Sequence, residues 1–174
     1  MTKKIKKALG TAAATAAVTA LGLVAPQTSV AETAAISHVK LSSKANAATR
    51  AIAAADPQAA KAAATLCGAG YELYNAERLP DARRFATLFT YDNGGTGPRN
   101  CECAVFDNNL GISQYMKLKM CENQASNPRC SVDANYYTQY AGPVRMNNCP
   151  TVTAIMADTP SSTAYINAVR GFCD

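Results

Sequence analysis

The strongest constraint on how this chain can fold is the distribution of its seven cysteines, which all lie between Cys67 and Cys173. All eight tyrosines and all four phenylalanines lie in the same stretch, residues 67–174. That stretch is long enough for one small domain. If the chain is exported, a domain of this size with so many cysteines is expected to be braced by disulfides, because a small core gains from covalent cross-links.

The first 31 residues have the features of a secretory signal peptide. Four lysines among the first seven residues make a positive start, and residues 8–25 follow without a charge. Ser29 and Ala31 then supply the two small residues that a signal peptidase reads. The alternative is a membrane-spanning helix, but Ala and Thr make the run weakly hydrophobic. We therefore predict a signal peptide over residues 1–31, a secreted protein, and no membrane span once the signal is removed.

The charge balance gives no reason to expect a nucleic-acid partner. The chain has 17 Lys and Arg against 12 Asp and Glu, a net charge of +5. Four of those lysines and none of the acids lie in residues 1–31, so residues 32–174 carry 13 basic and 12 acidic side chains, a net charge of +1. The basic excess therefore belongs to the export signal, whereas nucleic-acid binding needs a basic surface on the folded protein.

Residues 32–66 form a segment dominated by alanine, with no cysteine, aromatic residue or glycine. Alanine favours helix, and Asp56-Pro57 is expected to interrupt any helix that forms. Because the segment has few large apolar side chains, we expect it to be flexible or partly helical and to contribute little to a core. We predict a pro-segment or a tether.

The remainder, residues 67–174, has the alternation typical of antiparallel strands. Residues 85–91 place Phe89 and Tyr91 on one face and Leu88 on the other, and the turn-rich DNGGTGP follows. In SQYMKLKMCEN, residues 113–123, Met116, Leu118 and Met120 are expected to be buried, opposite a face with two lysines. Residues 134–146 are predicted to form one tyrosine-rich strand that ends or bulges at Gly142-Pro143.

The last third of the chain allows two interpretations. STAYINAVRGF, residues 162–172, fits a short helix with Ser162 as N-cap and Gly171 at its end, or an edge strand. Strands at short spacing without long helices between them predict a mainly β fold, an antiparallel β-sandwich or barrel braced by disulfides.

The cysteine spacing predicts some disulfides and leaves others open. Cys121 and Cys130 bracket an eight-residue connection, so they are expected to bond across a hairpin. In a strand, Cys101 and Cys103 point to the same face about 6.6 Å apart, which is poorly suited to a mutual bond. We expect one of these two to bond Cys67, and the other to be free or intermolecular.

A pairing of Cys149 with Cys173 completes the expected set of disulfides. Metal binding is not expected, because a structural zinc site needs four Cys or His ligands in knuckle-like spacing. Here the C-x-C pair stands alone, an extracellular compartment favours oxidation of the cysteines, and the single histidine, His38, lies in the alanine-rich segment. A nucleophilic site lacks a base for the same reason. Four acids, Glu72, Glu102, Asp107 and Glu122, are the ones that could meet in space, but no spacing signals it. We predict no cofactor and no enzyme.

Several short motifs resemble spore-associated protein A and its secreted actinobacterial relatives. They are CGAGYELYN at 67–75, NCECAV at 100–105, GISQYMKLKM at 111–120 and YYTQYAGPV at 136–144, followed by Cys149 and Cys173. The resemblance implies export, and association with the spore surface in some members, but no catalytic residues. It also implies that Cys101 is the family's structural cysteine, bonded to Cys67, and that Cys103 is an added one. Cys103 is therefore predicted to be the free thiol, or to form an intermolecular disulfide.

Three functions follow from these features. The first is an exported, non-catalytic protein that binds cell-wall or spore-surface components. The second is a carbohydrate- or ligand-binding β module, in which Tyr136, Tyr137 and Tyr140 face the ligand, although alternation puts about half of them in the core. The third is a secreted protease inhibitor that presents Arg129 on a loop clamped by Cys121 and Cys130.

Overall fold

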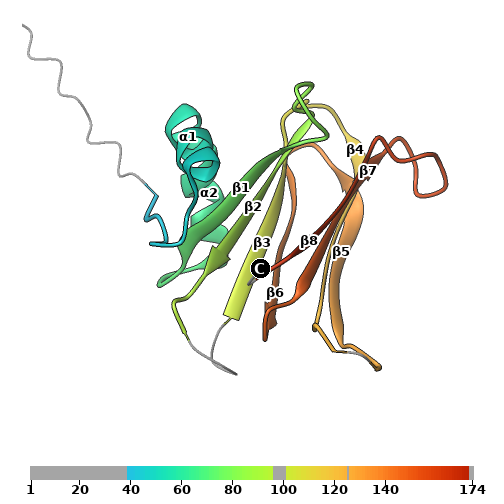
Figure 1. The fold of residues 1–174 in the computed structure, drawn as a ribbon. Helices are drawn as coiled ribbons and strands as arrows, with labels where there is room; N and C mark the ends of the chain where they lie inside the picture. Colours follow the sequence, from blue (N-terminus) through green and yellow to red (C-terminus); the bar gives the residue numbers. More distant parts are fainter. Residues whose placement is uncertain (1–38, 96–100, 125, 173–174) are drawn as a thin grey trace, which may run out of the picture. The chain divides into compact units, whose positions relative to one another are not determined.

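The protein is built from two four-stranded antiparallel sheets that face one another, as seen in a computed structural model that describes residues 39–95, 101–124 and 126–172 (Figure 1). The first sheet has the order β1 (Glu72–Leu79), β2 (Ala86–Asp92), β3 (Cys101–Asn108), β6 (Tyr140–Asn147). The second has the order β5 (Cys130–Tyr137), β4 (Gln114–Cys121), β7 (Thr151–Ala157), β8 (Ile166–Gly171). This confirms the predicted mainly β, sandwich-like fold. The predicted signal peptide, His38 and Cys173 lie outside the described residues.

The main core lies between the two sheets. Leu88 and Phe106 reach it from the first sheet, and Met116, Leu118 and Met120 reach it from the second, all with no exposed surface. The predicted burial of the methionine–leucine face is therefore confirmed, and Lys117 and Lys119 lie on the opposite, half-buried face of β4. Burial of alternate side chains in this way fixes the register of both sheets.

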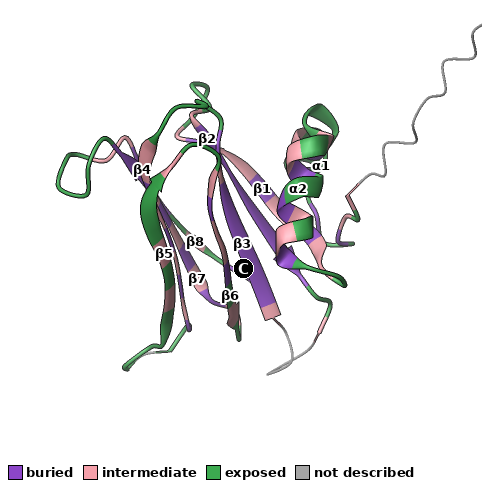
Figure 2. Cartoon of the chain, turned by 180° about the vertical axis from the view of Figure 1, so that it is seen from behind, coloured by how far each residue is buried: buried purple, intermediate pink, exposed green. Residues whose placement is uncertain are grey.

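Two helices cover the outer face of the first sheet. They are α1 (Ala47–Ala55) and α2 (Pro57–Cys67), and Asp56 ends the first and caps the second, so the interruption predicted at Asp56-Pro57 is confirmed. Figure 2 shows β2 and β3 largely buried beside these helices, whereas β5 is largely exposed (Figure 2).

The expectation that residues 32–66 contribute little to a core was wrong. Ala53, Ala60 and Ala63 are buried in a second core, together with Phe89 and Tyr91 of the sheet. The large apolar surface comes from the sheet, and small alanines let the helices approach it closely. The two helices and the eight strands belong to one compact unit, so helix and β structure are not separated at Cys67.

The chain changes sheets within the segment that was predicted to be one strand. β5 ends at Tyr137 and β6 begins at Tyr140, and each belongs to a different sheet. Asn108 stabilises the break, because its side-chain amide donates to the Tyr137 carbonyl (2.9 Å) and its backbone N–H donates to the Gln139 carbonyl (2.6 Å). The predicted bulge follows in β6. Ala141 and Val144 pair with Phe106 and Ala104, so Gly142 and Pro143 together stand opposite the single residue Val105.

The ambiguous C-terminal third is resolved as strand. β8 pairs with β7 in antiparallel register at the edge of the second sheet, so the edge-strand interpretation is confirmed and the helix capped by Ser162 is not formed. Within the described ranges, no helix has the length and hydropathy needed to cross a membrane.

Candidate functional site

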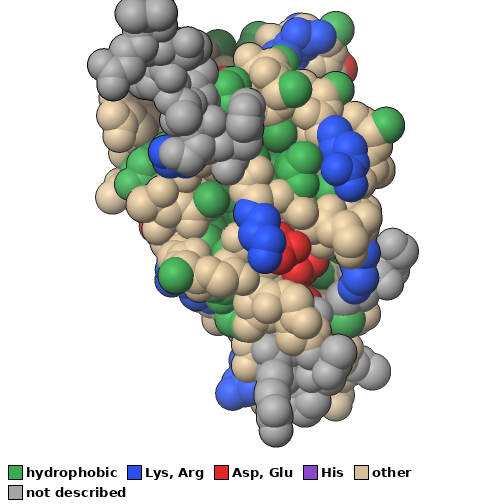
Figure 3. All heavy atoms as spheres, turned by 90° about the vertical axis from the view of Figure 1, so that its left-hand side faces the viewer, with side chains coloured by type: hydrophobic (Ala, Val, Ile, Leu, Met, Phe, Trp, Pro, Cys, Tyr) green, Lys and Arg blue, Asp and Glu red, His purple; other side chains and the backbone are tan. Residues whose placement is uncertain are grey.

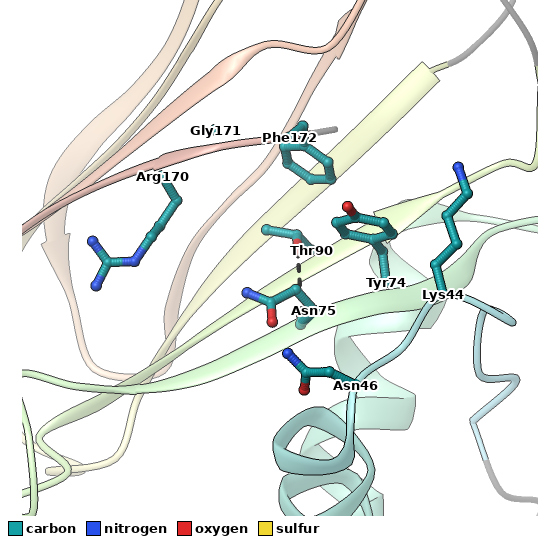
Figure 4. Close-up of a pocket in the computed structure, with 8 residues that line it drawn as sticks. All are labelled: Lys44, Asn46, Tyr74, Asn75, Thr90, Arg170, Gly171 and Phe172. Carbon is teal, nitrogen blue, oxygen red and sulfur yellow. Dashed lines mark hydrogen bonds between the residues drawn. The ribbon is translucent and has the colours of Figure 1, made fainter. Parts of the chain in front are cut away.

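A groove lies where the two sheets meet at their β1 and β8 edges. The turn from β5 to β6 joins the sheets on the other side, whereas β1 and β8 are separate edge strands. The groove has a volume of about 310 Å³. Strands β1, β2 and β8 and the segment before α1 supply its lining, which is drawn in Figure 4: Lys44, Asn46, Tyr74, Asn75, Thr90, Arg170, Gly171 and Phe172 (Figure 4).

Two contacts between side chains join β1 to β8 at this groove. The rings of Tyr74 and Phe172 are stacked, with centroids 5.6 Å apart. The guanidinium of Arg170 donates to both carboxylate oxygens of Glu77, from Nε to Oε2 at 2.6 Å and from Nη2 to Oε1 at 2.5 Å. The hydrogen bonds to Glu77 raise the pKa of Arg170 above its usual value, so this side chain stays cationic.

Thr49, a buried residue of α1, orients the amides of the groove. Asn46 caps α1, and its Oδ1 accepts the Thr49 backbone N–H at 2.8 Å. The Thr49 hydroxyl accepts the Ala76 backbone N–H at 3.1 Å and donates to Oδ1 of Asn75, also at 3.1 Å. The helix and the edge strand β1 are thus connected through one hydroxyl, and the orientation of both asparagine amides follows from these bonds.

The three tyrosines predicted to face a ligand surround a shallow hollow of about 280 Å³ at the β5–β6 turn. Their rings do not share one direction. Tyr136 is half exposed and packs edge-to-face on Tyr115, Tyr137 packs against the inter-sheet core, and Tyr140 packs against the helix-side core. Burial, and then a hydrogen bond to Asp133, raises the pKa of Tyr137 to about 12. A common aromatic platform is therefore not formed, and a ligand role for these residues stays a prediction.

The predicted hairpin disulfide, Cys121–Cys130, is present and joins β4 to β5. The prediction for the C-x-C pair was wrong: Cys67 bonds Cys103, hereafter the helix disulfide, and Cys101 is the free cysteine among the residues described. The two do not bond each other, as expected. Cys149 is disulfide-bonded, and its predicted partner Cys173 lies outside the described residues.

The end of helix α2 explains why Cys103 is the bonded cysteine. Arg145 is the cross-strand neighbour of Cys103, and its guanidinium donates to the carbonyls of Leu66 (2.7 Å) and Cys67 (3.1 Å). These bonds place the last residue of α2 over the row that contains Cys103, with a Cα–Cα distance of 5.9 Å, inside the usual range for a disulfide. The Cys101 sulfur instead accepts a hydrogen bond from the Tyr71 hydroxyl at 3.0 Å.

The four acids named from the sequence are not brought together. Glu72 and Glu102 are both in register with Asp92, so these three carboxylates form a row across β1, β2 and β3. Glu122 directly follows β4, on the other sheet, and pairs with Arg129. Asp107 is mostly buried elsewhere on β3, and burial, and then the carboxylate of Asp56, raises its pKa to about 6. In the described part of the chain no group of three or more Cys, His, Asp or Glu is arranged to hold a metal ion.

Sequence reasoning missed the groove and the central acid of the carboxylate row, Asp92. The groove combines residues from Lys44 to Phe172, and no local pattern connects positions so far apart. The one local signal is Asn46, which immediately precedes a run of helix-forming residues and is a good N-cap. On the described part of the face shown in Figure 3, Lys and Arg side chains are dispersed, in keeping with the near-neutral charge of residues 32–174 (Figure 3).

Searches of protein-family models, curated proteins and solved structures find no match to this chain.

Proposed function

We propose that this chain is an exported, non-catalytic protein that associates with the cell or spore envelope. The observation that carries the proposal is the presence of the helix and hairpin disulfides, and of a disulfide-bonded Cys149, in a chain with a signal-like segment over residues 1–31. Disulfides persist in oxidising compartments outside the cell and are rare in the cytosol. The motifs that resemble spore-associated protein A favour the envelope as the destination.

The contacts of the carboxylates support a non-catalytic role. Glu72 pairs with Lys40 at 2.5 Å, and Glu122 is held by the guanidinium of Arg129. Asp92 accepts hydrogen bonds from the Ser42 hydroxyl (3.3 Å) and the Gly94 backbone N–H (3.0 Å). General acid–base catalysis needs a carboxyl group that faces substrate and exchanges a proton with it, whereas these three stabilise the fold.

A ligand-binding β module is the second candidate, and the groove between β1 and β8 favours it. Its volume of about 310 Å³ lies at the lower end of the range for small-molecule sites, and it combines an aromatic wall with a few polar groups. The inhibitor function is less well supported. Arg129 is tied to Glu122, so a protease could use it as bait only after that ion pair was broken.

Cell fractionation tests the proposed function. The full chain with a C-terminal tag is expressed in a Gram-positive host, and wall, medium and cytosol fractions are analysed by intact mass. We expect a product that begins at Glu32 in the wall or spore fraction. Ala31→Phe should prevent cleavage because the site needs a small residue, whereas the nearby Ala34→Phe should be processed normally. Recovery of full-length protein in the cytosol would refute export, and recovery only in the medium would refute envelope association.

A further inference from the structure

We propose that the groove between β1 and β8 binds an anionic sugar, meaning a carbohydrate unit that carries a carboxylate or a phosphate. The inference rests on the proposed function for the source of the ligand, since it takes the envelope to supply such units. Some hydrogen-bonding groups of the groove are already used within the protein, and the groups that remain determine which ligand can bind.

The two asparagines of the groove have their amide oxygens occupied. Asn46 Oδ1 accepts from the Thr49 backbone N–H, and Asn75 Oδ1 accepts from the Thr49 hydroxyl. The Thr49 hydroxyl accepts from the Ala76 N–H and donates its single proton to Asn75 Oδ1. Each asparagine is left with its NH₂ group, a donor of two hydrogen bonds. Both amides thus offer donors to the groove.

The charged groups of the groove are hydrogen-bond donors as well. Lys44 is exposed, and no acid among the described residues forms an ion pair with it. An ammonium donates hydrogen bonds and cannot accept them. Arg170 is the other cation of the lining, although Glu77 engages two of its nitrogens and the Val169 carbonyl accepts from the third at 2.8 Å. The lining contains no Asp or Glu. The two amides and the two cations therefore favour a ligand that supplies acceptors, and a negatively charged oxygen is the strongest acceptor available. Thr90 is the exception in the lining, because its hydroxyl donates to the Asn75 carbonyl and can only accept from a ligand.

The aromatic side chains and the volume narrow the ligand further. The stacked rings of Tyr74 and Phe172 give the groove an apolar wall beside its donors. Aromatic rings pack well against the C–H faces of a sugar, and the Tyr hydroxyl adds a polar tip. A volume of about 310 Å³ accommodates one or two sugar rings and not a long segment of polymer. An acidic monosaccharide, free or at the end of a glycan, fits the donors, the aromatic wall and the volume of the groove.

Two substitutions test whether the asparagine NH₂ groups donate to the ligand, and both change the shape of the side chain very little. Asn75→Asp keeps an oxygen for Thr49 and replaces the NH₂ group by a second carboxylate oxygen. Asn46→Asp does the same, and Asp is as good an N-cap as Asn, so α1 should remain intact. Asn135→Asp is the matched control, because it adds the same charge on β5, at the opposite edge of the second sheet. Thermal unfolding of each variant checks that it is folded.

Binding is measured by NMR titration of the ¹⁵N-labelled oxidised protein, residues 32–174, with glucuronate, glucose 6-phosphate, neutral glucose and acetate. We expect both anionic sugars to shift the amide signals of groove residues and to bind at least tenfold more tightly than glucose or acetate. Asn75→Asp and Asn46→Asp should each weaken binding of the anionic sugars at least tenfold, because a carboxylate then faces an anion. The Asn135→Asp control should bind like the parent.

The proposal is overturned if neither anionic sugar shifts groove signals at 10 mM, roughly the weakest affinity that such a titration detects. It is also overturned if glucose binds equally well, or if a folded Asn75→Asp protein binds like the parent. Failure of the groove is distinguishable from failure of the proposed function. A chain that is exported and held in the envelope but does not bind these sugars retains the proposed function and loses only this inference.

Discussion

Gly142 is the position where a single added methyl group is expected to perturb the fold most specifically. It lies in the bulge of β6 with φ at +102°, a conformation that side chains other than glycine rarely adopt. A Cβ atom there would lie 2.9 Å from the Ala104 carbonyl oxygen and 2.9 Å from Cδ2 of Leu118. The leucine side chain can adjust, but the backbone oxygen belongs to the paired strand β3 and cannot.

The cost of Gly142→Ala therefore has two parts that can be measured separately. Backbone strain at positive φ costs about 1–3 kcal/mol, and forcing a methyl group into a packed interior costs about 1–3 kcal/mol more. Gly70→Ala is the matched control, since Gly70 has a similar φ of +89° and no atom within 4 Å of the added Cβ. We expect a loss of about 1–3 kcal/mol for the control and about 2–6 kcal/mol for Gly142→Ala.

Urea denaturation of the oxidised protein gives both values as changes in the free energy of unfolding, provided that the m-value stays constant. A double-mutant cycle with Leu118→Ala adds a second check. Removing the leucine side chain relieves one of the two short contacts, so the two changes should couple by about 0.5–3 kcal/mol. If Gly142→Ala costs no more than Gly70→Ala, or if no coupling with Leu118 is found, the close approach of β6 to the core is refuted.

Three further predictions concern the cysteines and a buried acid. Loop length predicts the cost of removing each disulfide. Removing the helix disulfide, with a sequence separation of 36, should cost about 4 kcal/mol, and removing the hairpin disulfide, with a separation of 9, about 2.5 kcal/mol. The reverse order in urea denaturation would contradict this. Alkylation without reduction, followed by peptide mapping, should modify Cys101 and leave Cys103 unmodified, and label on Cys103 would show that the pairing is wrong. The pKa of Asp107 is raised from 3.8 to about 6. Between about pH 4 and pH 6 the native state therefore binds more protons at this residue than the unfolded chain does. As a result, Asp107 lowers the free energy of unfolding as the pH rises through that range. Asp107→Asn should remove that decline and be more stable than the parent at pH 7; an unchanged dependence of stability on pH would argue against the raised pKa.

Local patterns were sufficient to predict the parts of the fold that are governed by local rules. Alternation identified the buried face of β4, and the spacing of Cys121 and Cys130 identified the hairpin disulfide. In both cases the residues lie on one strand or on two strands that pair with each other. The two-residue period of a strand is then enough to predict which side chains share a face. The bulge at Gly142-Pro143 was predictable for a similar reason, because proline cannot donate to a ladder.

The incorrect predictions for the C-x-C pair and for the strand over residues 134–146 have one physical cause. In each, the structure depends on a contact with a distant part of the chain. Strand periodicity shows that Cys101 and Cys103 face the same way, but only the end of α2, held by Arg145, selects Cys103. The break between β5 and β6 has no strong turn residue, and Asn108 of β3 supplies the hydrogen bonds that stabilise it. Neither contact can be found from a local window of sequence.

The alanine-rich segment illustrates how this limit affects function as well as fold. Its composition suggested a tether, because alanine offers little apolar surface. In the fold, Thr49 of that segment is buried against β1 and determines which way Asn46 and Asn75 present their amides. The helix thus does more than shield the sheet, because without α1 the two amide oxygens would be free to accept hydrogen bonds from a ligand. The selectivity proposed for an anionic ligand therefore originates in the docking of this helix on the edge of the first sheet.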